Sequence, residues 1–190
     1  MEEIKGLKYI PNIMSEYKEQ KLIEYIDSKP WDNTLKRRTQ QYGHRYIYNH
    51  INNNNNNKNN EVAKIPKKFL RLFTKLREKD LGSDIDLDKL QVIVNEYLPG
   101  QGIASHIDDP NQFGDWIICV SIGSGCIIKF TQPKENKNEN IYIEKCSVYE
   151  MKNDARFNWK HQIECVKYDT INNVKQNRGR RISITFRYKN

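Results

Sequence analysis

Short β-rich runs dominate the chain from residue 91 onward, and they restrict its fold more than any other feature. Runs of four to eight apolar, β-branched and aromatic residues are typical of strands. They cover residues 92–97, 116–122, 127–132, 141–144, 147–151, 157–163 and 182–188, with glycines and Pro133 between them. A series of this kind suits a jelly-roll barrel or sandwich, and we expect a double-stranded β-helix, that is, a jelly-roll, cupin-like barrel.

Two helices are predicted in the first half of the chain. Residues 15–28 have a capping serine at the start, an apolar stripe at three- and four-residue spacing, and a proline just beyond the end. Residues 66–79 start at a proline and have a similar stripe. Both stripes are core-forming faces, so we expect an α+β, mainly β fold with N-terminal supporting helices.

The length of 190 residues fits one domain, and we expect residues 1–190 to form a single unit. An asparagine-rich tract interrupts it at about residues 49–61. Such a tract buries too little apolar surface to offset its ordering entropy, which predicts a disordered loop. A specific amide-rich recognition loop is the alternative interpretation.

Basic residues outnumber acidic ones, with 32 lysines and arginines against 24 aspartates and glutamates, so the formal net charge is +8. This excess favours a polyanionic partner such as nucleic acid, through phosphate contacts and counterion release. No apolar stretch has the length of a membrane span, and the N-terminus lacks the apolar run of a signal peptide. We therefore expect a soluble intracellular protein, cytoplasmic rather than nuclear, with no membrane contact.

Cys-x-x-Cys spacing is typical of zinc sites and redox pairs, and the four cysteines of this chain do not show it. Cys119 falls within an apolar, strand-like run. Buried reduced thiols are the expected state of Cys119, Cys126, Cys146 and Cys165.

Three residues are candidates for one metal site. His106 and Asp108 are two positions apart, so in a strand or at a strand end both side chains lie on one side. His161 lies on a run in which apolar residues share its parity. Two imidazoles and one carboxylate can occupy one face of an octahedral metal and leave three positions open, as in non-heme Fe(II) oxygenases. A short His-x-Asp pair alone also occurs by chance.

The C-terminal run carries a second signal. Arg181, Ser183, Thr185 and Arg187 share one face if the tail at residues 180–187 forms a strand. A buried guanidinium on that face could bind a dicarboxylate with two parallel hydrogen bonds.

Together these stretches resemble the AlkB-like Fe(II)/2-oxoglutarate dioxygenases. The similar segments are residues 95–108, 120–125, 154–156 ahead of His161, and 181–187. The likeness covers roughly residues 36 to 188. Residues 37–43, 99–103 and 183–187 look most like the branch that hydroxylates the wobble uridine of tRNA. The resemblance implies a jelly-roll fold, Fe(II) as cofactor, and 2-oxoglutarate and O2 as co-substrates.

The resemblance also implies roles for individual residues. His106, Asp108 and His161 would bind the iron and form the catalytic centre. Arg181, helped by Tyr97, would hold the distal carboxylate of 2-oxoglutarate. Asn95 and Arg187 would contact the metal-proximal end of the co-substrate. Ser183 stands where some relatives have a co-substrate-binding asparagine, so it is also expected to contact the co-substrate. Tyr97 as a core aromatic and Arg187 as a solvated charge are the alternatives.

Residues 37–48 interleave cations with aromatic side chains, which is the pairing needed to bind phosphates and stack an unpaired base. The resemblance implies that this segment forms part of a nucleotide-recognition lid. The expected substrate contacts are Arg38, Tyr42, His44 and Tyr46. An ordinary amphipathic hairpin whose tyrosines pack on the barrel is the alternative.

We therefore expect a dioxygenase that hydroxylates a nucleic acid, either tRNA or another single-stranded substrate, with a modified tRNA uridine as the first choice. Oxidative dealkylation of N-alkylated bases in DNA or RNA is the alternative. A non-catalytic nucleic-acid-binding module and a protein-directed oxygenase are further alternatives. The wobble-uridine enzymes also carry RNA-recognition and methyltransferase domains, so a separate partner could supply those functions here.

Overall fold

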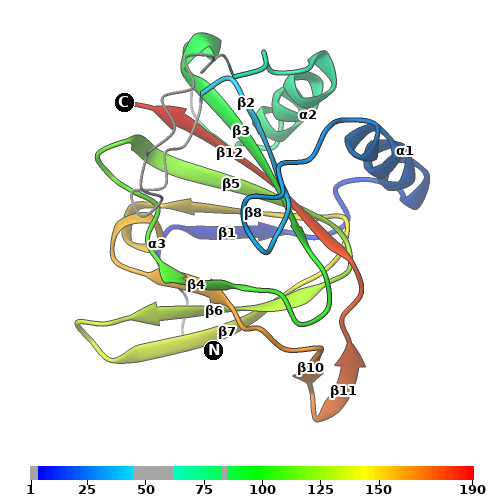
Figure 1. The fold of residues 1–190 in the computed structure, drawn as a ribbon. Coiled ribbons are helices and arrows are strands. Elements are labelled where there is room, and N and C mark those ends of the chain that lie inside the picture. The colour runs from blue at the N-terminus through cyan, green and yellow to red at the C-terminus, as the bar shows by residue number, and fades with distance from the viewer. Residues whose placement is uncertain (1–3, 45–61, 83–84) are drawn as a thin grey trace.

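Antiparallel strands in two main sheets make up most of the chain, as shown by a computed structural model that describes residues 4–44, 62–82 and 85–190 (Figure 1). The asparagine-rich tract lies outside the described residues. The elements are β1 (Leu7–Ile10), α1 (Glu16–Asp27), β2 (Thr39–Tyr42), α2 (Lys67–Arg77), the 3-10 turn η1 (Leu87–Lys89), β3 (Leu90–Tyr97), β4 (Ile103–His106), β5 (Phe113–Gly123), β6 (Cys126–Gln132), β7 (Lys137–Ile143), β8 (Ser147–Lys152), α3 (Asn153–Phe157), β9 (Lys160–Ile163), β10 (Tyr168–Ile171), β11 (Val174–Asn177) and β12 (Arg181–Lys189).

The larger sheet has six strands in the order β1-β8-β5-β12-β3-β2. The C-terminal strand β12 lies in its interior, paired with β5 on one side and β3 on the other. In this register Arg181 is opposite Tyr97, and Ser183 is opposite Asn95. Residues directly opposite one another in an antiparallel pair face the same side of the sheet. The register therefore brings all four of these side chains to one face.

The two faces of the larger sheet differ in chemistry. On β12, Ile182, Ile184 and Phe186 are buried in an apolar cluster with side chains of α1 and α2. The alternate residues of β12 point to the opposite face. Figure 1 shows both helices beside β2 and β3, on the side of this sheet away from β4, β6 and β7. The helices therefore cover one face, as the sequence predicts, and leave the other face for the second sheet.

The second sheet has four strands in the order β4-β9-β6-β7. A second apolar cluster fills much of the space between the sheets, with Ile117 and Met151 from the larger sheet and Ile128 and Phe130 from the smaller one. The mainly β jelly-roll arrangement of the prediction is confirmed. Within the described residues, however, the strands form two open sheets packed face to face rather than a closed barrel.

Both predicted helices are confirmed to within two residues at each end. The Ser15 side chain caps α1 by accepting a hydrogen bond from the Lys18 backbone N–H. In α2 the residues at spacing i, i+4 and i+7, namely Phe69, Phe73 and Leu76, are buried. This spacing places them on one face of the helix, against the sheet.

Two smaller predictions are wrong. The run 157–163 is not a continuous strand, because α3 ends at Phe157 and β9 begins only at Lys160. The turn is stabilised by the Asp154 carboxylate, which accepts from Trp159 Nε1 at 2.7 Å. Phe157 is consequently exposed instead of core-facing. Cys165 is also exposed, whereas the other three cysteines are buried as expected.

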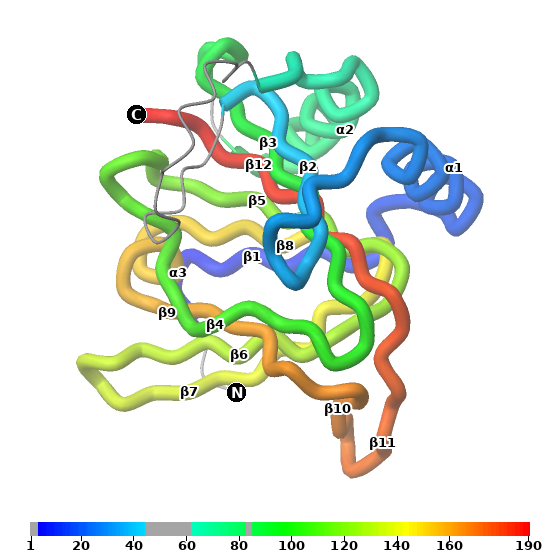
Figure 2. Tube along the Cα trace, viewed as in Figure 1, coloured from blue at the N-terminus to red at the C-terminus, as the bar shows by residue number. Residues whose placement is uncertain are grey.

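A small hairpin, β10–β11, projects beyond the two sheets (Figure 2). It is fastened at its base by Arg178, which forms two hydrogen bonds of 2.6 and 2.7 Å with the Asp169 carboxylate and one with the Glu164 carbonyl. In the sequence, the hairpin lies between β9, which carries His161, and β12, which carries Arg181. Over the described ranges, no helix is both long and apolar enough to span a bilayer.

Replacing Phe73 by alanine should lower the free energy of unfolding by about 3–5 kcal/mol, measured by chemical denaturation. The reason is that its ring stacks on Trp116 and Phe186, with centroids 5.7 and 5.5 Å away. The control is Val174→Ala on the exposed hairpin, where we expect a change within about 0.5 kcal/mol. Equal effects of the two substitutions would contradict this picture of the core.

Candidate functional site

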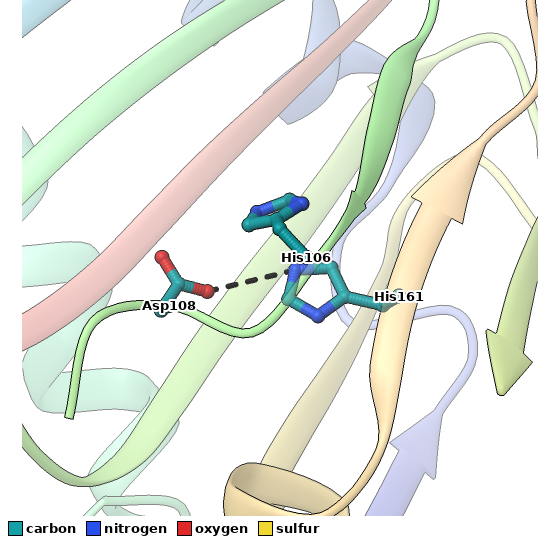
Figure 3. Close-up of side chains that lie close together, drawn as sticks. All are labelled: His106, Asp108 and His161. Carbon is teal, nitrogen blue, oxygen red and sulfur yellow. Dashed lines mark ion pairs between the residues drawn. The ribbon is translucent and has the colours of Figure 1, made fainter. Parts of the chain in front are cut away.

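The three predicted metal ligands come together between the two sheets (Figure 3). His106 ends β4 and His161 lies on β9, and the two are partners in the antiparallel register. Their rings therefore face the same side, with centroids 4.3 Å apart. Asp108 follows β4 and brings its Oδ2 to 3.5 Å from His161 Nε2. The ligand atoms of all three residues lie within 4.8 Å of one another, close enough to bind one ion.

A hydrogen bond orients His106, and burial sets the protonation state of His161. The Ala104 carbonyl is 2.8 Å from His106 Nδ1, and because a carbonyl can only accept, Nδ1 carries the proton. His106 Nε2 is then left as the ligand atom. Burial, followed by the proximity of His106, lowers the pKa of His161 to about 4 in spite of Asp108. His161 is therefore a neutral imidazole at physiological pH.

The Asp108 carboxylate is oriented by Arg187, which comes from a distant part of the chain. The Arg187 guanidinium on β12 donates to Asp108 Oδ1, while Oδ2 is on the side of His161. Burial alone would raise the pKa of Asp108, but Arg187 and the two histidines lower it below its usual value. The carboxylate is thus ionised and aimed at the position of the metal.

Arg156 holds the backbone of the loop that carries Asp108, a role that the sequence did not reveal. Its buried guanidinium donates to the carbonyls of Asp108, Phe113 and Gly114 at 2.8, 3.1 and 3.0 Å. Burial lowers the pKa of Arg156. A single arginine in a short segment gives no sequence signal of burial, so only the structure could show this contact.

Arg181 is a buried cation whose hydrogen-bonding capacity is mostly unused. Its Nε donates to Ser121 Oγ at 2.9 Å, and its guanidinium carbon is 5.6 Å from the Tyr97 ring centroid. Among the described residues, Nη1 and Nη2 have no hydrogen-bond partner although both are buried. Such unpaired donors are costly, and a bound carboxylate would satisfy both with bidentate geometry. Arg181 could therefore hold an anionic ligand.

A pocket of about 510 Å³ contains these groups. Its floor is formed by pocket-facing residues of β3 and β12, and apolar side chains such as Ile103, Ile128 and Ile163 form other walls. All five residues expected near the co-substrate line it, namely Asn95, Tyr97, Arg181, Ser183 and Arg187. Tyr97 is buried, which raises the pKa of its hydroxyl to about 12 and keeps it a hydrogen-bond donor at neutral pH. The predicted grouping of metal and co-substrate residues is thus present as one cavity.

The expected substrate contacts are placed differently. Tyr42 packs against Phe69 on the helix-covered face and donates to Gln40 Oε1, so its assignment as a substrate contact is wrong. Arg38 does not line the pocket, since its guanidinium is bound to the Glu96 carboxylate. Arg38 as a substrate contact therefore stays a prediction, at a position outside the pocket itself.

His44 also lies away from the pocket, because its Nε2 is 2.6 Å from the Asp88 carbonyl. Tyr46 lies outside the described residues. The pocket-lining residue of this segment is Arg37, which the sequence reasoning passed over. Thr39 and Gln41 pair with Asn95 and Ile93 of the pocket face, so the odd-numbered residues of this segment are on the pocket side of the sheet.

Comparison with known proteins agrees with this geometry. Residues 6–187 match the model of the 2OG-Fe(II) oxygenase superfamily. The match covers nearly the whole chain. The chain belongs to this superfamily.

Three relatives illustrate the range of the family. An uncharacterised mimivirus protein, L905, is 36% identical over 97% of this chain and 85% of its own length. An Arabidopsis thaliana protein named alkylated DNA repair protein ALKBH8 homolog is 29% identical over 97% of this chain, which spans 58% of that protein. A Macaca fascicularis protein named tRNA (carboxymethyluridine(34)-5-O)-methyltransferase ALKBH8 is 30% identical over 87% of this chain, which spans 25% of it.

Solved structures confirm the fold. The structure of OsALKBH1 superposes with a TM-score of 0.63, covering 96% of this chain and 97% of that one at 13% identity. A Pseudomonas putida prolyl-4-hydroxylase superposes with a TM-score of 0.59, covering 97% and 92% at 11% identity. The arrangement of the two sheets is therefore shared with proteins whose sequences differ widely.

The residues of the pocket fit the groups that the family name implies, Fe(II) and 2-oxoglutarate, with O2 as the second co-substrate. A set of two imidazoles and one carboxylate suits Fe(II) and leaves positions for a co-substrate. The unpaired donors of Arg181 suit the free carboxylate of 2-oxoglutarate. Metal and co-substrate are thus each matched by a separate group of side chains.

Replacing Asp108 by alanine should weaken Mn(II) or Fe(II) binding by more than about 100-fold, because a ligand contributes more than the groups that orient it. Isothermal titration under anaerobic conditions measures this. The neighbouring carboxylate provides the control: Asp109→Asn should retain metal affinity, since in the described part of the chain the Asp109 carboxylate accepts hydrogen bonds from its own loop. Unchanged binding in the Asp108 variant would exclude the proposed ligand set.

Replacing Arg181 by glutamine should weaken 2-oxoglutarate binding to the metal-loaded protein on the order of 10- to 100-fold, the value of a charge-assisted hydrogen-bond pair. Metal affinity should be unchanged. Arg180→Gln is the control, because Arg180 pairs with Asp27 and Glu96 outside the pocket and should leave 2-oxoglutarate affinity intact. If the Arg180 variant alone lost affinity, Arg181 would not be the anchor.

Proposed function

We propose that the protein hydroxylates a nucleic acid, and most specifically a modified uridine of a tRNA. The observation that carries the proposal is the combination of a metal triad and an unpaired buried arginine in one cavity of about 510 Å³. Pockets of about 300–1,000 Å³ bind small ligands, so the cavity has room for a co-substrate and one base together. The net charge of +8 and the name of the macaque relative support a nucleic acid substrate.

The depth of the ligands limits how a substrate can be presented. His161 and Asp108 have side chains only 12% and 11% exposed, between two sheets. A base inside a helical stack could not reach them, so the target nucleotide must be unpaired or extruded. Anticodon loops of tRNA offer such unstacked bases, in keeping with the way proteins read RNA in single-stranded loops.

The side chains of the pocket divide the work of the reaction. When bound, Fe(II), 2-oxoglutarate and O2 supply an oxidation that converts a substrate C–H group to C–OH while 2-oxoglutarate is decarboxylated. Arg187 keeps the Asp108 carboxylate aimed at the metal, and Arg181 fixes the orientation of the co-substrate. The isoleucines of the walls exclude water and so strengthen both electrostatic contacts.

Oxidative dealkylation of N-alkylated bases is the second candidate, because the Arabidopsis relative is named an alkylated DNA repair protein. The same site supports both reactions. Hydroxylation of a carbon attached to carbon leaves a stable alcohol, whereas hydroxylation of an N-methyl group leaves a carbinolamine that releases formaldehyde. The group held over the metal decides between them.

The test is mass spectrometry of three substrate pools after incubation with Fe(II) and O2, with and without 2-oxoglutarate. The pools are total tRNA, methylated single-stranded DNA and peptides. We expect a uridine derivative with one added oxygen in tRNA, dependent on 2-oxoglutarate and absent with Asp108→Ala. Formaldehyde with loss of a methyl group would favour dealkylation instead. A product in the peptide pool alone, or in none of them, would contradict a nucleic acid substrate.

A further inference from the structure

The pocket has more arginines than are needed to orient the metal ligand and to bind the co-substrate. Among its described lining residues are three arginines, Arg37, Arg181 and Arg187, and a single carboxylate, Asp108. Arg187 is paired with Asp108, and Arg181 fits a carboxylate of 2-oxoglutarate. Fe(II) and doubly ionised 2-oxoglutarate cancel each other's charge, so loading the site leaves the cavity positive. Arg37 is the cation that remains without an anion.

The contacts of Arg37 are few. Its Nε donates to Asn95 Oδ1 at 3.1 Å, and within the described part of the chain it forms no ion pair with a carboxylate. Arg38 is the opposite case, because Glu96 accepts from two of its nitrogens. A half-buried guanidinium in a partly apolar cavity is stabilised by an anion, and its planar donors suit carboxylate and phosphate groups.

The chain on both sides of Arg37 is fixed in place. On one side, Gln101 Nε2 donates to the Lys36 carbonyl at 2.8 Å. On the other, the Glu96 backbone N–H donates to the Arg38 carbonyl at 3.0 Å, and the Glu96 side chain binds the Arg38 guanidinium. The backbone of Arg37 is therefore already ordered at the pocket, which reduces the entropy lost when a ligand binds.

We propose that Arg37 is a specificity-determining residue that binds an anionic oxygen group of the substrate. The group is either a carboxylate on the substituent of the base or a phosphate next to the base, because both offer the same paired acceptor oxygens. This inference rests on the proposed function in one respect, that the substrate is a nucleotide. It assigns to Arg37 the role that the sequence had placed on Arg38 and Tyr42.

A purely structural role for Arg37 makes a different prediction. If Arg37 only orients Asn95 through the Nε contact, its loss would disturb the co-substrate end of the pocket. Affinity for 2-oxoglutarate would then fall, and the preference among substrates would remain. Measuring both affinities separates the two roles.

The experiment measures binding without turnover, using the full chain loaded with Mn(II) and 2-oxoglutarate under anaerobic conditions. The probes are uridine, 5-carboxymethyluridine, its neutral amide 5-carbamoylmethyluridine, and uridine 5′-monophosphate, titrated by NMR. The wild type should bind one anionic probe on the order of 10- to 100-fold more tightly than uridine or the amide. Preference for 5-carboxymethyluridine assigns a carboxylate, and preference for the monophosphate assigns a phosphate.

Arg37→Gln should abolish this preference and leave 2-oxoglutarate affinity within about twofold of the wild type. Arg37→Lys should restore part of it, because a lysine retains the charge without the planar fork. Lys36→Gln is the matched control: it removes one positive charge from the next residue, whose side chain is exposed and does not line the pocket, and should keep the full preference. Circular dichroism checks that each variant is folded.

Three results would overturn the inference: no preference for either anionic probe in the wild type, a preference that survives in Arg37→Gln, or loss of 2-oxoglutarate affinity as the main effect of that variant. Failure of the proposed function is a separate result. If the anion preference depends on Arg37 but tRNA yields no product, the assignment of Arg37 stands and the tRNA substrate is wrong. If Arg37→Gln hydroxylates tRNA with the KM of the wild type, the tRNA substrate stands and the assignment of Arg37 is wrong.

Discussion

The alternation of side chains along β12 is the constraint on which the rest of the protein depends. Ile182, Ile184 and Phe186 form the core under the helices, while the odd-numbered residues, from Arg181 to Arg187, form the floor of the pocket. A strand repeats every two residues, so one short segment serves both the stability of the fold and the chemistry of the site. A shift of its register by one residue would bury the arginines among the helices and expose the apolar face.

The pocket is built at a cost in stability. Burying guanidinium groups is unfavourable unless each one finds a partner, and Arg181 leaves two nitrogens unsatisfied among the described residues. The fold tolerates this because the core between the helices and the larger sheet is apolar and independent of the cavity. The other two arginines of the pocket are Arg187, which is paired with Asp108, and Arg37, which precedes β2. The unpaired donors of Arg181 would therefore be satisfied by the same co-substrate that the site is shaped to bind.

Much of the fold could be predicted from periodicity. The helix stripes and most of the strands of the second half were identified because each has the apolar repeat of its element. The pairing of β1 with β8 could not be predicted, since those strands are far apart in the sequence and short runs carry no signal of their partner. The interruption before β9 was missed because Phe157 and Trp159 imitate the alternation of a strand, although a helix ends between them.

The candidate site also has a part that could be predicted from the sequence and a part that could not. The candidate metal ligands and the arginines of β12 were predicted from residue type, spacing and family resemblance, and the structure brings them to one pocket. Which of the adjacent arginines Arg37 and Arg38 lies on the pocket side could not be predicted, because the two are identical and only pairing with β3 distinguishes them. The anchoring by Arg156 depends on three carbonyls of one loop, which no local pattern encodes.

The β10–β11 hairpin bears on how such sites can change during evolution. It occupies the interval between His161 and Arg181, yet it projects away from both sheets and is closed at its base by Arg178 and Asp169. Because its two ends are already fixed, the interval could lengthen or shorten without moving either functional strand. The distance in sequence between the last metal ligand and the first arginine is therefore free to drift, and homologues are better recognised by the strands on either side than by a constant gap.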